Sequence, residues 1–523
     1  MTATTDAPVR PRPSSAARAV PLTAARLLRI ELRHSPMPWI LPLIAALFWF
    51  DSYRPSIQTE PLYVIRTFWN LGQGGTIIDF GPFVAAVAAW MGSRDGRRRL
   101  ADLVTATPRP RWTAQLATWA ATAIWAVAAY LVFVGVMFAM YAHQGVGGAP
   151  PWWWVAVGVT GVIAFSAAGF AVGVFWPSRF AAPVAAFGSA LILLMSSRTG
   201  FTHTSGWAMI LPTNSNGNFQ NDSGISYPWL PDLPIARIMF LAGIAAAVLG
   251  VTGLPARAGG PGLRRAAAVI AVAGLALAGT ATGLASSARL TAHGMAIPGL
   301  HDAASDAPIA YTPVCGHAAG VPVCLNPAYG RWLPAITGAL APELAEVAGL
   351  PGAPARATQV ATGYTGGPVA PPGPPVATGA AGPPQALTLT GQPAVLRLSL
   401  GMLNMPGPCG FCDGPVNGTQ FAGQVRLMFA HAFVGAGSAP GSPAQRAVQA
   451  ALLRGAGIPF AAQPLVMGHT DNFPGAPRSK SATGPIYAAA RRFAALPATA
   501  RHAWLAAHLA ALRAGQLTLK DLP

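Results

Sequence analysis

The chain has 523 residues, of which 52% are hydrophobic and only 10% are charged. Soluble domains usually carry about 25% charged residues, so this composition disfavours a protein that lies wholly in water and indicates a membrane protein. The net charge of +18 is compatible with nucleic acid or an anionic membrane face. Half of the arginines flank apolar runs and no zinc-finger, bZIP or RNP motif occurs, so we expect no nucleic-acid partner.

Residues 1–36 are predicted to form a cytoplasmic basic tail that ends in an interfacial helix. No small-residue cleavage site follows the first apolar run, which argues against a cleaved signal. Within 22–34, Arg26, Arg29 and Arg33 lie three and four residues apart on one helical face, and leucines occupy the other. This spacing predicts a helix that lies at the membrane surface and contacts lipid. A disordered basic tail is the alternative, above all for the residues before this helix.

Residues 37–287 are predicted to form a transmembrane, permease-like bundle of α-helices. A helix needs about 20 apolar residues to cross a bilayer, because its backbone polar groups must be satisfied within the helix. About seven candidate stretches occur, of which the first, second and fifth are short and would need flanking residues. The stretches are 37–50, 77–92, 114–141, 152–176, 180–195, 234–254 and 266–285.

The distribution of arginine predicts the orientation of the bundle. Short cytoplasmic loops favour Lys and Arg. With the N-terminus inside, sixteen arginines fall in inner segments and four in outer loops or helix ends. We therefore expect a multi-pass plasma-membrane protein with a cytoplasmic N-terminus. An odd number of spans then makes residues 288–523 an extracytoplasmic domain.

Ionisable side chains within the predicted spans are few. Asp79 lies near the mouth of the second stretch, and Arg237 lies near an end of the sixth, where a long side chain can snorkel to the interface. Intramembrane carboxylates usually mark proton or ion pathways. Their scarcity disfavours a proton- or sodium-coupled transporter, so the energy for any transport is expected to come from outside the chain.

The predicted inner loop from 93 to 112 mixes basic charge with apolar residues. Leu100, Leu103 and Val104 follow helical spacing between clusters of arginine. Such a loop can form a short amphipathic helix that offers both charge and an apolar anchor to a cytoplasmic partner. A solvated loop that only fixes the topology is the alternative.

These features together resemble the permease subunits of type-2 ABC exporters. The resemblance covers about residues 20–255 and rests on the basic helix, the first span, and a second span that runs into an Arg-rich segment ending Leu-Val-Thr-Ala-Thr-Pro-Arg-Pro-Arg-Trp before a long third span. The Ala, Arg, Gly and Pro bias is similar to that of actinobacterial chains. This chain departs from the family by one additional span and by the domain over 288–523.

The resemblance implies a division of labour between subunits. Such permeases work as homodimers, or as heterodimers with a sister permease, and ATP binds to a separate cytoplasmic ATPase subunit. No GxxxxGK[ST] loop occurs here, so no cofactor is expected on this chain itself. The family's coupling helix falls by position within 94–107, and the resemblance assigns the ATPase-coupling loop to Arg94, Asp95, Arg97, Arg98, Arg99, Leu100 and Leu103.

All four cysteines lie beyond the predicted spans, as expected for an oxidising compartment. We favour the pairs Cys315 with Cys324 and Cys409 with Cys412, because each closes a short local loop. Two alternatives remain open. Cys409 and Cys412 form a CxxC motif, but Asp-Gly-Pro follows where a redox motif would begin a helix. The four thiolates, or His317 with some of them, are a possible zinc ligand set.

The C-terminal domain is predicted to be mixed α and β. A capped amphipathic helix is expected over 326–349, followed by a Pro/Gly-rich loop over 351–385. Alternating leucines predict two short strands within 387–400. A capping-box pattern predicts a helix from Ser442 to Arg454, and a last helix is expected from Ala498 to Ala514.

No catalytic or metal-ligating motif emerges from the sequence. Neither HExxH nor GxSxG occurs, and His431, His469, His502 and His508 show no metal-ligand spacing. We therefore expect a non-enzymatic membrane subunit of an ATP-driven ABC exporter. A membrane-anchored extracytoplasmic binding or sensor protein without transport activity is the alternative. A membrane-embedded enzyme is disfavoured, because no polar cluster is evident at the membrane faces.

Overall fold

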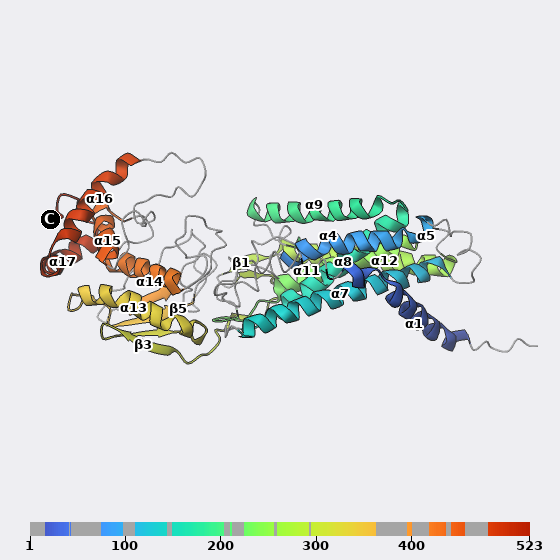
Figure 1. Ribbon diagram of the computed structural model, residues 1–523, viewed down its shortest axis with the longest axis horizontal. Helices are drawn as coiled ribbons and strands as arrows, with labels where there is room; N and C mark the ends of the chain where they lie inside the picture. Colours follow the sequence, from blue (N-terminus) through green and yellow to red (C-terminus); the bar gives the residue numbers. More distant parts are fainter. Residues whose placement is uncertain are drawn as a thin grey trace, which may run out of the picture.

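The structure is a computed structural model, and it shows two regions of different architecture. Long helices lie side by side in one half of the molecule, and a small sheet with shorter helices occupies the other (Figure 1). The structure describes residues 16–40, 42, 46, 75–97, 110–143, 149–202, 210–211, 224–255, 259–291, 294–361, 395–399, 418–435, 441–455 and 480–523.

The helical half begins with the predicted amphipathic helix, which is confirmed and starts six residues earlier than expected. All of its remaining helices except the short α5 overlap the predicted apolar stretches, although α9 extends beyond its stretch to Thr202. The helices are α1 (Ala16–His34), α4 (Gly75–Gly92), α5 (Arg94–Arg97), α7 (Arg111–His143), α8 (Trp152–Phe175), α9 (Ala181–Thr202), α11 (Asp232–Thr252) and α12 (Pro261–Ser286).

Four helices in the described part of the chain are long and apolar enough to cross a membrane, and they indicate a membrane protein. They are α8, α11, α12 and the Arg111–Ala139 part of α7. The apolar segments Phe80–Gly92 of α4 and Ala181–Ser196 of α9 are shorter. At about 1.5 Å per residue they fall short of a hydrocarbon core of about 30 Å. The prediction of about seven spans is therefore wrong, and its first stretch, 37–50, lies mostly outside the described residues.

Small residues allow α4 and α8 to pack backbone against backbone. Gly169 and Gly173 form a GxxxG pair on α8, and a Cβ atom at either position would overlap a carbonyl oxygen of α4, that of Ala85 or Ala89. A Cβ atom on Gly92 would overlap the carbonyl oxygen of Phe170. Because lipid tails are as apolar as the side chains, such close van der Waals packing is what holds membrane helices together.

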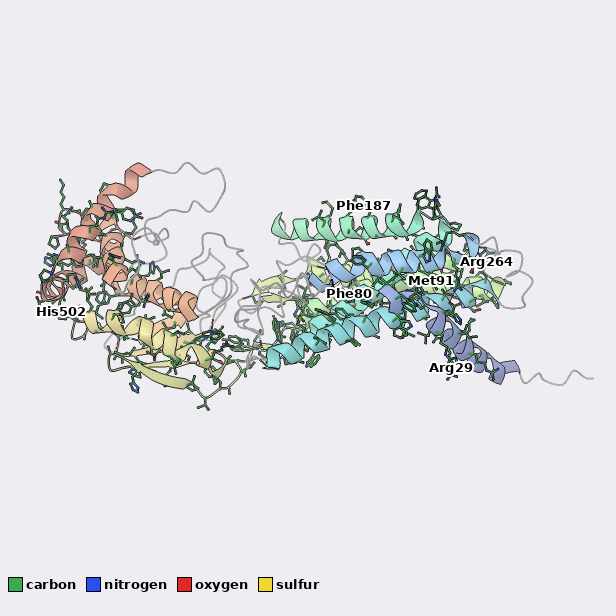
Figure 2. All side chains as sticks on the ribbon, in the orientation of Figure 1. Arg29, Phe80, Met91, Phe187, Arg264 and His502 are labelled. Carbon is green, nitrogen blue, oxygen red and sulfur yellow. A yellow bond between two sulfur atoms is a disulfide. The ribbon has the colours of Figure 1, made fainter. Side chains whose placement is uncertain are left out.

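Glycines also allow α11 and α12 to pack backbone against backbone. A Cβ atom on Gly243 would lie only 2.7 Å from the Ala278 nitrogen and 2.7 Å from the Gly274 oxygen. The opposite side of α12 and most of α9 remain exposed, and Phe187 of α9 is 73% exposed (Figure 2). In a membrane protein these apolar faces are suited to lipid.

Arg237 does not snorkel as predicted. Its side chain is fully buried, and its guanidinium carbon lies 5.3 Å from the centroid of the Trp154 ring. Because α11 begins at Asp232, Arg237 lies in the second turn, where the helix packs against α8. Instead of reaching the membrane interface as predicted, the Arg237 guanidinium makes a cation–π contact inside the bundle.

The other half contains a mixed four-stranded sheet of order β3-β4-β5-β6. The first two strands are antiparallel and the others run parallel to β4. The strands are β3 (Val314–Ala318), β4 (Val321–Leu325), β5 (Arg356–Val360) and β6 (Val395–Ser399), and a separate two-stranded ribbon consists of β1 (Arg289–Thr291) and β2 (Gly294–Ala296).

The sheet packs against α13 and α14, further helices pack on these two, and the mixed α and β prediction is confirmed. The elements are the 3-10 helices η3 (Ala303–Asp306) and η4 (Pro327–Trp332), and the α-helices α13 (Leu333–Glu346), α14 (Gly418–Phe433), α15 (Pro443–Gly455), α16 (Lys480–Ala495) and α17 (Ala498–Arg513).

Two helix starts are built as the sequence predicts. The side chain of Asn326 accepts a hydrogen bond from the Ala328 nitrogen, although the first turn is a 3-10 helix rather than an α-helix. Ser442 and Gln445 form a reciprocal capping box, with N–O distances of 2.7 and 3.3 Å. Each satisfies backbone donors that a helix terminus leaves without partners.

The predicted loop over 351–385 is wrong for residues 356–360, which form β5. Ala357 and Gln359 of this strand are buried, whereas Arg356 is exposed and Thr358 and Val360 are half-buried. Period-two burial of this kind favours a strand, but the surrounding Pro/Gly content obscures the pattern. Of the two strands predicted within 387–400, the second is confirmed as β6, and the first lies outside the described residues.

The predicted disulfide between Cys315 and Cys324 is confirmed. The two cysteines are direct cross-strand partners in the β3–β4 hairpin, with a Cα–Cα distance of 4.1 Å. Two residues further along the hairpin, His317 pairs with Pro322. Proline has no N–H, so it fits a pair that exchanges no backbone hydrogen bonds. The Cys315–Cys324 pair is of the same kind, in which opposite Cα atoms are closest. Cys409 and Cys412 lie outside the described residues.

Candidate functional site

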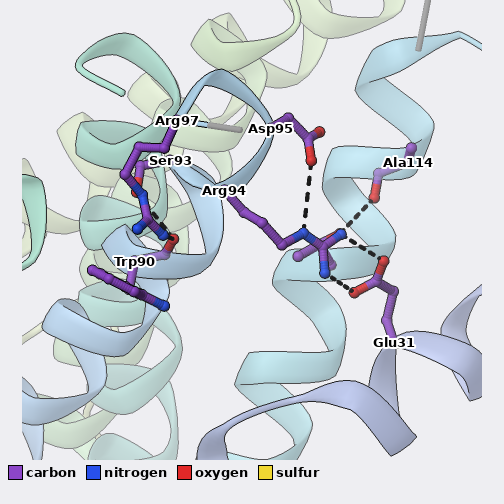
Figure 3. Close-up of polar contacts among 8 residues, drawn as sticks. Glu31, Trp90, Ser93, Arg94, Asp95, Arg97 and Ala114 are labelled. Carbon is purple, nitrogen blue, oxygen red and sulfur yellow. Dashed lines mark hydrogen bonds and ion pairs between the residues drawn. The ribbon is translucent and has the colours of Figure 1, made fainter. Parts of the chain in front are cut away.

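The predicted coupling loop begins at a polar junction between α1, α4 and α5. Arg94 donates two hydrogen bonds to Glu31 of α1, from Nη2 to Oε1 at 2.9 Å and from Nη1 to Oε2 at 3.1 Å (Figure 3). This fork geometry is the strongest form of an arginine–carboxylate pair. The hydrogen bond to Glu31 raises the pKa of the Arg94 guanidinium despite its partial burial.

Asp95 is a weaker partner of the same arginine. Its Oδ1 lies 3.6 Å from Arg94 Nε, beyond hydrogen-bond distance, and its side chain is partly exposed. Arg94 therefore lies between two carboxylates, of which Glu31 has the closer and more directional contact (Figure 3).

Arg97 folds back onto the end of α4. Its Nε donates to Ser93 Oγ at 3.0 Å and its Nη2 donates to the Trp90 carbonyl at 3.0 Å. The guanidinium carbon lies 3.5 Å from the centroid of the Trp90 ring. An arginine at a helix C-terminus satisfies a terminal carbonyl and complements the helix dipole. Arg97 thus fixes the α4–α5 corner.

A third contact holds α5 against the turn between α8 and α9. A Cβ atom on Gly96 would overlap the side chain of Pro177. Glycine is therefore required by space at this position, and α5 packs directly on that turn.

The same junction anchors α1 to the bundle. Trp125 of α7 donates from its indole nitrogen to the Leu32 carbonyl at 3.0 Å. Arg29 of α1 is exposed, and Figure 2 shows it on the helix that projects from the bundle. The apolar and acidic face of α1 therefore packs inward, and its arginines face outward as the amphipathic pattern predicts.

The structure brings together only part of the predicted coupling loop. Arg94, Asp95 and Arg97 lie in α5, a helix of four residues. The other predicted residues, Arg98, Arg99, Leu100 and Leu103, lie outside the described residues. The two described arginines are bound within the chain, which the sequence interpretation did not anticipate.

Four residues of this junction were missed in the sequence. Glu31, Trp90, Ser93 and Pro177 were not singled out by the sequence patterns. A single acidic residue within a basic helix was a usable signal for Glu31, because an isolated carboxylate on the face opposite the arginines must be paired if that face is buried. The partner itself was not predictable, because Arg94 is 63 residues away.

The described residues contain no group of three or more His, Cys, Asp or Glu side chains suited to hold a metal ion.

Comparison with known proteins gives no relative. The sequence matches no protein-family model, and no curated protein or solved structure is detectably similar to it.

Proposed function

We propose that this chain is the membrane-spanning subunit of an ATP-driven ABC exporter of the type-2 class, and that a separate cytoplasmic ATPase docks on the loop that begins at α5. The chain acts as a homodimer or pairs with a sister permease. We propose further that its N-terminus is cytoplasmic and residues 288–523 are extracytoplasmic, an arrangement that needs an odd number of crossings and therefore at least one shorter apolar helix in addition to the four long ones.

The observation that carries this proposal is the way α5 is tied to three other parts of the bundle. Arg94 links it to α1, Arg97 links it to the end of α4, and Gly96 packs on the turn after α8. A docking element transmits a movement only if it is mechanically connected to the helices that must move. These contacts make α1, α4, α5 and the α8–α9 turn one connected unit.

The charge distribution and the disulfide support the orientation. The basic segments around α1, α5 and the start of α12 fall on one side when the N-terminus is inside, as short cytoplasmic loops require. The Cys315–Cys324 disulfide fits an oxidising compartment on the other side.

Affinity purification in mild detergent tests the proposal. An ATPase subunit is expected to copurify with the tagged wild-type chain. The double variant Arg98→Glu/Arg99→Glu is expected to recover about tenfold less of it, because charge complementarity steers docking. The matched control is Arg264→Glu/Arg265→Glu, which reverses two exposed arginines at the start of α12.

The outcomes separate the proposal from its alternative. If the intact wild-type chain recovers no ATPase, the permease proposal fails and a membrane-anchored binding or sensor protein is favoured. If both double variants recover as much ATPase as the wild type, the ATPase docks elsewhere.

A further inference from the structure

A histidine with a carboxylate at each ring nitrogen lies where the chain leaves the helical bundle. His301 Nδ1 is 3.0 Å from Asp232 Oδ2, and its Nε2 is 3.1 Å from Asp306 Oδ2. Asp232 belongs to the first turn of α11, and Asp306 ends η3. His301 therefore bridges the bundle and the first segment of the C-terminal half.

With both aspartates as carboxylates, the geometry requires a proton on both ring nitrogens. A carboxylate only accepts hydrogen bonds, and a neutral imidazole carries a single N–H. A neutral His301 would thus direct one lone pair at a carboxylate oxygen about 3 Å away. Only the imidazolium donates to Asp232 and Asp306 at once.

Because Asp232 is buried, the stability of its contacts depends strongly on the positive charge of His301. Asp232 is fully buried, its Oδ2 also accepts from the Ile297 nitrogen at 2.8 Å, and its Oδ1 accepts no hydrogen bond. A buried carboxylate is costly without a cationic partner. Loss of the His301 charge would therefore weaken the contacts that Asp232 makes to residues 297 and 301.

The other charged side chains near this cluster either bind other groups or face solvent. Asp302 accepts from the Ala304 nitrogen and caps η3. Arg237, five residues along α11 from Asp232, lies over Trp154, and Arg289 of β1 is exposed. Burial lowers the pKa of His301, but the hydrogen bonds to Asp306 and Asp232 outweigh it, so the pKa is raised.

We propose that His301 is a proton-dependent latch, which holds residues 294–309 on the end of α11 while it is protonated and releases them when it loses its proton. The apolar contacts of Ile297 with Ala236 and Ala285 and the bond from the Ile309 nitrogen to the Ser226 carbonyl remain. Release is thus a local opening of the connection between bundle and C-terminal half, rather than unfolding.

The direction of the pH effect follows from the raised pKa. A histidine whose pKa is higher in the folded state stabilises that state fully below its ordinary pKa of about 6.5. This stabilisation is lost as the pH rises through the folded value. The latch is therefore closed at mildly acidic pH and opens as the pH rises through the pKa of His301 in the folded chain, which lies above the ordinary value of about 6.5.

Hydrogen–deuterium exchange on the full chain in nanodiscs tests the latch. Protection of the peptide that covers residues 294–309, corrected for the intrinsic pH dependence of exchange, is expected to fall about tenfold between pH 6 and pH 9. Protection of α8 is expected to stay constant over the same range. Constant protection of 294–309 at every pH would overturn the proposal.

Two variants and a control assign the effect to His301. His301→Gln, which has no titrating group, is expected to show no pH dependence in this peptide. Asp306→Asn, at a largely exposed position that tolerates change, is expected to move the midpoint down by about one pH unit. His502→Gln, which alters a histidine bound to the Ala348 carbonyl, should behave as wild type. The same pH dependence in His301→Gln as in wild type would assign the opening to another group.

Discussion

Two sites with buried or partly buried charged residues, the Arg94–Glu31 pair and Glu343, affect the stability of the fold in opposite ways. The Arg94–Glu31 pair is mostly shielded from solvent and joins segments 63 residues apart. Glu343 of α13 is almost fully buried, and neither of its carboxyl oxygens has a hydrogen-bond partner. The charge of Arg94 is stabilised by Glu31, whereas burial without a hydrogen-bond partner favours the uncharged form of Glu343.

Reversing Arg94 should destabilise the bundle, and a charge swap should restore it. Arg94→Glu places two carboxylates side by side and is expected to cost about 1 to 2 kcal/mol in thermal unfolding in detergent. The swap Glu31→Arg/Arg94→Glu should recover most of this loss. Arg265→Glu, at an exposed position, is the control and should change little. A swap no more stable than Arg94→Glu alone would mean that the pair does not hold α5 to α1.

Glu343 gives the C-terminal half a distinct pH dependence. Burial raises its pKa well above the ordinary value of 4.5, Arg426 opposes this shift and Glu346 adds to it. Between pH 4.5 and the folded pKa, the unfolded chain loses the proton and the folded chain keeps it, so stability falls by about 1.4 kcal/mol per pH unit.

The substitution Glu343→Gln should therefore stabilise the protein at neutral pH and have no effect below pH 4.5. Thermal unfolding of both proteins across this pH range provides the measurement. An equal stability difference at every pH would show that Glu343 is not titrating between the two states.

At the scale of elements, close helix packing depends on glycines that face another backbone. Gly173 of α8 faces α4, and a Cβ atom there would also lie 2.8 Å from the Ser93 nitrogen. Gly188 of α9 has no atom within 4 Å of an added Cβ. The two glycines have the same helix propensity, so they differ only in what surrounds them.

Gly173→Leu should separate α4 from α8 and cost about 2 kcal/mol or more. Gly188→Leu should be neutral or slightly stabilising, because leucine favours a helix by about 1 kcal/mol over glycine. The yield of monodisperse protein in detergent and its thermal unfolding measure both. Equal behaviour of the two variants would contradict the packing described for α8.

The β3–β4 hairpin depends on its disulfide. Cys315→Ser/Cys324→Ser removes a cross-link over nine residues, which is expected to cost about 2 to 3 kcal/mol through the unfolded state. Addition of a reductant to the wild type should have the same effect. Unfolding of the double variant at the wild-type temperature would show that the hairpin needs no cross-link.

Local signals explain which elements were predictable. Hydropathy placed α8, α11 and α12, and the Ser442 and Gln445 pair placed the start of α15. The β3–β4 hairpin was missed, because its turn is Ala319-Gly320 with positive φ at both residues, a conformation that alanine rarely adopts. Pro322 within β4 also argues against a strand.

At the scale of the whole molecule, long-range contacts set the candidate site and the sequence could not supply them. The approach of α1 to α5 joins Glu31 to Arg94, and the latch joins Asp232 to His301. Neither pair follows a helical or strand period, because the partners lie far apart in the sequence and meet only through the tertiary fold. The span count failed for a different reason, because the short stretches in α4 and α9 were counted as spans although their apolar segments are shorter than the hydrocarbon core.

ATP hydrolysis by the complex that copurifies with this chain tests the central claim most directly. In nanodiscs, the wild-type preparation is expected to hydrolyse ATP above a mock purification, Arg94→Glu to lower the rate several-fold, and the swap Glu31→Arg/Arg94→Glu to restore it. A folded wild-type preparation with no ATPase activity above the mock would contradict the proposal of an ATP-driven exporter subunit.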